Sequence, residues 1–222
     1  MKLIAAIAML SFALSLCGLT EKFTSKKDES GNSNNSNSST SNSNKGTDKP
    51  SDSSGGGDVA TPEMTASQKA AIEGGQTVTW AEQGITWTVP ANWKKMSSDV
   101  NSLQWQSPSP YGFLIVNVSS MSADFPVGPA TDALFTGDAP RKQSGELLSY
   151  RWLSLDGVKG VEDLEAEKSA KGDPRRLQWR GYRNYKGMVQ YVSIMLSSES
   201  QNFSKHDDAL HAILYSTKID KE

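Results

Sequence analysis

The order of apolar and polar positions divides this chain into three parts. Residues 3–16 form an unbroken run of apolar and small side chains after Lys2, and residues 24–58 carry no apolar side chain. From Val59 onward, apolar and polar positions alternate in short stretches typical of β-strands, with amphipathic stretches typical of helices at both ends. We therefore expect one folded domain over residues 59–222, a length that can bury an ordinary core.

The first strands of this domain are predicted as a hairpin. Thr77–Trp80 and Gly84–Val89 are short alternating runs joined by a polar turn. Antiparallel pairing places Val78 opposite Trp87 on an apolar face and leaves threonines on the other face. Further strands are predicted over Leu103–Ser107, Phe113–Ser119, Tyr150–Leu155, Val161–Lys168, Arg175–Arg183 and Met188–Leu196.

Helices are predicted before, between and after these strands. A first helix is expected from Thr61 to about Glu73, and short helical pieces are expected over residues 129–148, where two glycines and a proline interrupt the pattern. A closing helix carries Leu210, Ile213 and Leu214 on one stripe, with Ser204 and Asp207 as a capping box. Two groups of strands, separated by a helical connection and with helices at both ends, predict an α+β sandwich.

Pairing the later strands brings opposite charges together on one face. The predicted register pairs Arg176 with Glu167 and Arg180 with Asp163. Arg and Tyr are over-represented in binding hot spots, so this face is the candidate binding face. It consists of Arg176, Arg180, Tyr182 and Tyr191. A covering helix, or salt bridges of purely structural value, is the alternative interpretation.

The first 58 residues indicate export. Lys2 and the apolar run have the pattern of a secretory signal, and the run is shorter than the about 20 residues that a transmembrane helix needs. Residues 14–18, Leu-Ser-Leu-Cys-Gly, resemble the lipobox of bacterial lipoproteins, in which the cysteine is lipidated and becomes the mature N-terminus. That resemblance implies a signal peptide over residues 1–16 and a lipid anchor at Cys17. Ordinary signal cleavage after Ser15 is the alternative, because Leu16 stands where a small residue is usual.

These features predict where the protein works. Residues 17–58 are expected to form a lipid-anchored, Ser/Asn-rich disordered tether, because they cannot bury enough apolar surface to offset their ordering entropy. The expected location is the bacterial cell envelope, at the outer membrane or facing the periplasm, or at the cell membrane of a monoderm. Cys17 is the only cysteine, so no disulfide, thiol nucleophile or cysteine-based metal site is expected in the folded domain.

Three stretches resemble the PsbP family. They are Gly84–Trp93, with its strand followed by Pro-x-x-Trp, Leu155–Gly160, with its Leu-Asp-Gly turn, and Phe203 with Ala209–Leu214 in the closing helix. The resemblance implies an antiparallel sheet flanked by helices on both sides, an α/β/α sandwich that the family shares with a yeast Ran-binding protein. It also implies a docking or accessory module and no enzymatic activity.

Charge and motifs narrow the function further. With 23 Lys+Arg against 25 Asp+Glu, the chain has no electrostatic footprint for nucleic acid. His206 and His211 lie five residues apart, a spacing that does not suit a metal pair on one helix, and no cofactor motif is present. We expect a non-catalytic module that binds a protein partner. A glycan- or cell-wall-binding module that uses exposed aromatics, or an undetected hydrolase, is the alternative.

Overall fold

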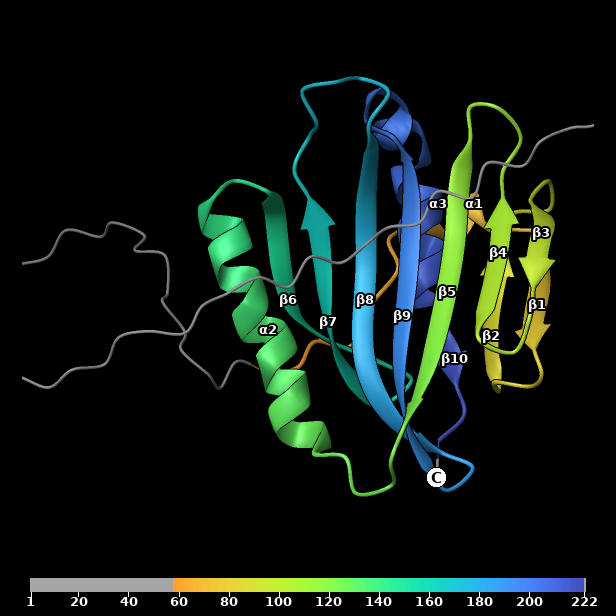
Figure 1. Ribbon diagram of the computed structural model, residues 1–222. Coiled ribbons are helices and arrows are strands. Elements are labelled where there is room, and N and C mark those ends of the chain that lie inside the picture. The colour runs from red at the N-terminus through yellow and green to blue at the C-terminus, as the bar shows by residue number, and fades with distance from the viewer. Residues whose placement is uncertain (1–57, 222) are drawn as a thin grey trace, which may run out of the picture. The chain divides into compact units, whose positions relative to one another are not determined.

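The computed structural model describes residues 58–221, which form two antiparallel sheets and three α-helices (Figure 1). The predicted signal peptide, Cys17 and the tether up to residue 57 lie outside the described residues. The strands are β1 (Gln76–Trp80), β2 (Ile85–Val89), β3 (Lys94–Ser98), β4 (Ser102–Gln106), β5 (Gly112–Met121), β6 (Leu147–Leu155), β7 (Val158–Glu165), β8 (Pro174–Tyr185), β9 (Met188–Glu199) and β10 (Lys218–Ile219). The helices are α1 (Ala66–Ala71), α2 (Val127–Gln143) and α3 (Phe203–Tyr215), with a short 3-10 turn at Ser200–Asn202.

Helices cover both faces of the larger sheet. Seven strands follow the order β3-β4-β5-β9-β8-β7-β6, and β1, β2 and β10 form a separate three-stranded sheet. Helix α2 packs on one face against β6, β7 and β8, whereas α3 packs on the other against β9 and β2 (Figure 1). The main core lies on the α3 side, where Leu114, Val192 and Ile194 are fully buried. The predicted α/β/α sandwich is therefore confirmed, with the small sheet as an addition.

The first hairpin has the predicted register. Val78 lies opposite Trp87, and Trp80 lies opposite Ile85. Trp87 and Ile85 are fully buried, whereas Thr77 is exposed on the other face. The hairpin belongs to the small sheet, in which β2 also pairs with β10.

The first helix is shorter than predicted. It begins after Thr65, whose hydroxyl accepts a hydrogen bond from the backbone N–H of Gln68 while the Gln68 side chain accepts one from the Thr65 N–H. This reciprocal capping box fixes the start four residues after the predicted Thr61. The capping box predicted for α3 is also wrong, because that helix begins at Phe203 with no side-chain cap.

The prediction of short helical pieces between residues 129 and 148 is wrong, because α2 is one continuous helix of 17 residues. Pro140 lies in its last turns, and Gly145, at φ 79°, follows the C-cap where a left-handed residue ends a helix well. Packing on the sheet outweighs the weak local propensity. Phe135 stacks on Trp152 of β6, with 4.4 Å between ring centroids and 7° between ring planes.

The predicted pairing between β7 and β8 is shifted by two residues. Leu164 lies opposite Leu177, and Asp163 lies opposite Gln178 rather than Arg180. A shift of two keeps every side chain on its predicted face, because strands alternate with a period of two. The partner of Arg176 is therefore Glu165, at 3.1 Å, and not Glu167.

The sequence pattern did not predict strand β3. All five of its residues are exposed, so it lacks the apolar alternation that signals a strand. It is held by pairing with β4, with a register shift between Lys95 and Ser97 that marks a bulge.

Candidate functional site

The four residues of the predicted binding face all lie on the α2 side of the seven-stranded sheet. Arg176, Arg180 and Tyr182 occupy alternate positions of β8, and Tyr182 lies directly opposite Tyr191 of β9. The two tyrosine rings have centroids 5.2 Å apart. The structure therefore brings the four residues together along two neighbouring strands. They differ in whether α2 covers them.

Arg180 lies beneath α2 in a cluster of buried charges. Its guanidinium donates to Asp138 of α2 at 2.5 Å and to Asp163 of β7 at 2.9 Å. Arg141, one turn further along α2, also donates to Asp138 at 2.9 Å. The side chains of Asp138 and Asp163 are each 1% exposed. We call Asp138, Arg141, Asp163 and Arg180 the covered cluster.

Burial dominates the electrostatics of this cluster. It raises the pKa of Asp163 to about 6, although Arg180 and Arg141 favour the charged form. Asp138 adds to the rise, because a second carboxylate nearby disfavours ionisation. The covered cluster fixes α2 on the sheet, and its groups are engaged with one another. Sequence reasoning found Arg180 and Asp163 but not Asp138, since nothing local showed that α2 would pass over β8.

The other three predicted residues lie at the boundary of this covered region. Arg176 bonds to Glu165, and its side chain remains 39% exposed. Tyr182 and Tyr191 are half-buried, and Phe125 in the loop before α2 packs on Tyr182 with centroids 5.3 Å apart. Burial raises the pKa of the Tyr191 phenol, so it stays protonated and neutral at physiological pH.

Beyond this boundary, none of the helices within residues 58–221 covers the same sheet face. Helix α2 packs on β6, β7 and β8, and the strands β4, β5 and β9 continue past it (Figure 1). Nine side chains of β4, β5 and β9 on this face, which precede Glu199 at the end of β9, are uncharged. We call them the open face: Gln104, Gln106, Phe113, Ile115, Asn117, Ser119, Tyr191, Ser193 and Met195. Gln104, Asn117 and Ser119 are exposed, and the apolar members are half-buried.

A cavity of about 210 Å³ lies at one end of the open face. Met96 and Tyr111, which are 59% and 52% exposed, are its apolar lining, and Lys94 contributes a cation. The Tyr111 and Phe113 rings have centroids 6.3 Å apart, so the cavity adjoins the open face. We call this hollow the edge cavity; its lining is Asn92, Lys94, Met96, Gln106, Ser107, Pro108 and Tyr111.

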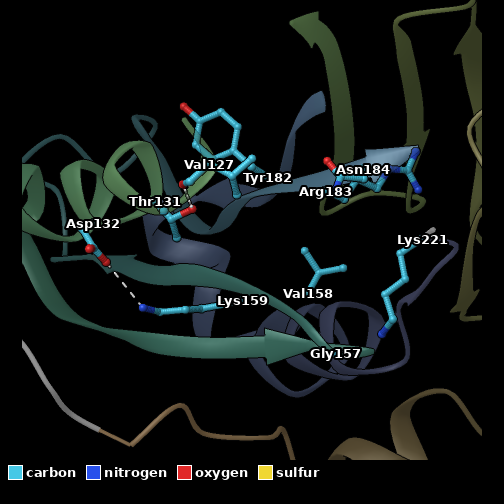
Figure 2. Close-up of a pocket in the computed structure, with 11 residues that line it drawn as sticks. Val127, Thr131, Asp132, Gly157, Val158, Lys159, Tyr182, Arg183, Asn184 and Lys221 are labelled. Atoms are coloured by element: carbon cyan, nitrogen blue, oxygen red, sulfur yellow. Dashed lines mark hydrogen bonds and ion pairs between the residues drawn. The ribbon is translucent and has the colours of Figure 1, made fainter. Parts of the chain in front are cut away.

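A larger cavity of about 350 Å³ lies where α2 begins beside the ends of β7 and β8 (Figure 2). Its cations are engaged. Lys159 pairs with Asp132 at 3.4 Å and lies 3.7 Å from the centre of the Trp152 ring, and Lys221 donates to a backbone carbonyl. Arg183 donates inward to the backbone oxygens of Gln83 and Asp220. These contacts indicate a structural junction.

Arg183 is another buried charge, besides Asp138, that sequence reasoning missed. It is 3% exposed, and its guanidinium donates to the Gln190 side chain at 2.8 and 3.0 Å as well as to two backbone oxygens. Gln190 in turn donates to Gln83 at 3.1 Å. Burial lowers the pKa of Arg183. The network joins β8 and β9 to the turn between β1 and β2, and so connects the two sheets.

The two histidines occupy different environments on α3. His211 Nδ1 lies 3.3 Å from a carboxylate oxygen of Asp207, one turn earlier on the helix. Burial opposes the charged imidazole, but the hydrogen bonds to Asp207 prevail and raise the pKa of His211, whereas burial lowers the pKa of His206. Within residues 58–221, no group of three or more His, Cys, Asp or Glu side chains is arranged to hold a metal ion.

Comparisons with known proteins address the fold. No family model matches the chain, and no curated protein does. LpqN, which is involved in cell envelope biogenesis of Mycobacterium tuberculosis, matches with 14% identity and a TM-score of 0.50 over 65% of this chain and 89% of its own. The chain therefore shares its fold with LpqN. At 14% identity the likeness concerns the fold and leaves the function open.

Two further solved structures are similar at lower scores. Cyanobacterial PsbP (CyanoP) from Synechocystis sp. PCC 6803 is 14% identical, with a TM-score of 0.46 over 65% of this chain and 92% of its own. The Ran-binding protein MOG1P of Saccharomyces cerevisiae is 10% identical, with a TM-score of 0.36 over 65% and 95%. Among the described helices, none is both long and apolar enough to cross a bilayer.

Proposed function

We propose that this chain is a non-catalytic lipoprotein of the bacterial cell envelope whose PsbP-like domain docks a protein partner through the open face. The observation that carries the proposal is that the nine side chains of the open face are uncharged and that no helix of residues 58–221 covers them. LpqN, which shares the fold, is involved in cell envelope biogenesis, and the lipobox-like sequence at Cys17 supports an anchored location.

The composition of the open face is that of an interface core. The centres of protein–protein interfaces are depleted in charge and enriched in aromatic residues and Met. Phe113, Tyr191 and Met195 provide such side chains without burying them fully. Arg176 and Tyr182 lie at the boundary with the covered cluster, where a polar rim around the open face is expected.

The chemistry of this face supports binding rather than catalysis. General acid–base catalysis needs a titratable group with a pKa near the working pH. Tyr191 is the titratable residue of the open face, and its pKa is raised. His211, the histidine bound to a carboxylate, lies on α3 on the opposite side of the sheet.

Site-specific crosslinking tests the docking face. A photo-crosslinking residue at Asn117, which is exposed on the open face, should give a discrete adduct with one envelope protein in intact cells. The same residue at Thr79, exposed on β1, is the matched control and should give none. Equal adduct patterns at the two positions would reject the open face as the docking surface.

A glycan is the second candidate ligand. Gln104, Gln106 and Asn117 place amides beside aromatic rings, and amides both donate and accept hydrogen bonds as sugar hydroxyls require. Binding of the full chain to isolated cell-wall polymer, lost on Asn117→Ala, would favour this candidate over a protein partner.

The anchor has its own test. Cys17→Ser should release the protein from the membrane fraction, because it removes the thiol that would carry the lipid. A membrane-bound Cys17→Ser variant, or a mature N-terminus at Leu16 by mass spectrometry, would contradict lipidation.

A further inference from the structure

The two edges of the seven-stranded sheet differ. At β6, the chain itself occupies part of the outer edge: Ala60 forms a parallel bridge to Leu153, and Ser154 donates to the Ala60 carbonyl at 2.8 Å. At β3, pairing is with β4 alone among residues 58–221, and all five residues are exposed. An edge strand with free N–H and C=O groups is a template for another strand.

Charge on β3 selects among the strands that could add there. Lys94 and Lys95 are exposed, and neither forms an ion pair within the described part of the chain. A second copy of β3 would bring two further lysines, and like charges across a strand pair are destabilising. The lysines therefore disfavour self-association and favour an acidic strand.

The edge cavity provides a place for a side chain of the added strand. Lys94 and Met96 line it from β3, and Tyr111 lines it from the turn before β5. In strand addition, main-chain hydrogen bonds supply affinity and pockets for alternate side chains supply specificity. The bulge at Lys95–Ser97 interrupts regular pairing, so the matching segment is short.

We propose that β3 is a strand-addition site for a short, extended, acidic segment of a protein partner. Its acidic side chains face Lys94 and Lys95, and an apolar side chain enters the edge cavity. This inference rests on the proposed function, since the edge cavity adjoins the open face. The partner would extend from the open face across β4 to the edge.

The test uses a synthetic probe and the full chain. The probe is a blocked peptide that repeats Glu-Glu-Val-Val, so that both faces of the added strand carry glutamate and valine, and it is longer than β3 at both ends. Hydrogen–deuterium exchange should show slower exchange of the β3 amides in its presence, with β1 and β6 unchanged. Lys94→Glu/Lys95→Glu should weaken binding by about three- to tenfold, as expected for two exposed ion pairs.

Two control peptides separate strand addition from simple charge attraction. A lysine–valine peptide should protect β3 only in the Lys94→Glu/Lys95→Glu variant. A glutamate–valine peptide with N-methylated valines keeps its charge but loses backbone donors, and it should fail to protect β3. Equal protection by the methylated peptide, or no protection by any peptide, would overturn strand addition. Crosslinking at Asn117 would still report independently on the open face.

Discussion

The two halves of one sheet face arrange their charges in opposite ways. Under α2, the covered cluster holds four charged side chains, two of them carboxylates that are almost fully buried. The nine side chains of the open face carry no charge, although several of them are exposed, and the nearest charge on β9 is Glu199 at the end of the strand. Charged residues usually face water, so this distribution is the reverse of the common one.

The difference separates what holds the fold from what is available to a partner. Arg180 and Tyr191 lie on neighbouring strands, yet Arg180 contacts two carboxylates that α2 shields from solvent, while Tyr191 faces the boundary of the open face. A face that looks uniform in the sequence is thus divided by one helix. The covered half is structural, and the open half is the half we propose for docking.

The largest expected effect is on the covered half. Arg180→Ala should lower the free energy of unfolding by about 3–5 kcal/mol, because it leaves Asp138 and Asp163 buried without their shared cation. Urea denaturation measures this directly. A cost below about 1 kcal/mol, the range of exposed ion pairs, would show that the cluster does not fix α2.

The next effect depends on pH. The pKa of Asp163 is about 6 in the folded protein and about 3.9 in the unfolded chain, so the folded state binds this proton more tightly. Stability from Asp163 is therefore complete below about pH 4 and is lost as the pH rises to about 6, by about 3 kcal/mol.

Asp163→Asn isolates this contribution, because asparagine does not titrate. The free energy of unfolding of the native chain, minus that of the variant, should fall between about pH 4 and pH 6. Parallel stability curves for the two proteins over this range would contradict the raised pKa.

A smaller effect is expected at the boundary. Arg176→Ala should cost only about 0–1 kcal/mol, because the Arg176–Glu165 pair is partly exposed to solvent. Urea denaturation of Arg176→Ala and Arg180→Ala side by side compares the free energy of unfolding that is lost at two arginines, four residues apart on one strand. Equal costs at both positions would remove the distinction between the covered and open halves.

The smallest effect on stability is expected on the open face. Gln104→Arg/Ser119→Arg should change the free energy of unfolding by no more than about 0.5 kcal/mol, since both side chains are exposed. The same variant should lose the partner, because it places charge in an interface core. A large loss of stability would show that the face is packed rather than open.

The sequence predicted the parts of this fold that depend on local alternation. The Val78–Trp87 pairing and the burial of Leu210, Ile213 and Leu214 follow from periodicity alone, and both are confirmed. The candidate binding residues were also placed on one face correctly, because a register error of two residues leaves each side chain on its side.

The rest depended on contacts between distant residues. Pro140 and Gly137 indicated a broken helix. The ring stacking of Phe135 on Trp152 and the ion pair of Asp138 with Arg180 stabilise α2 as one helix on the sheet. Strand β3 has no apolar pattern, because an exposed edge does not need one. Whether Arg180 was covered could not be read from β8, since the covering residue lies 42 positions away.

The most direct test of this account is the yield of the crosslinked adduct at Asn117 in two charge variants. Gln104→Arg/Ser119→Arg alters the open face, and Thr77→Arg/Thr79→Arg places the same charge on exposed positions of β1. With both variants folded, the account predicts that the adduct is lost in the first and retained in the second. An adduct retained in the first variant, or lost equally in both, would contradict docking through the open face.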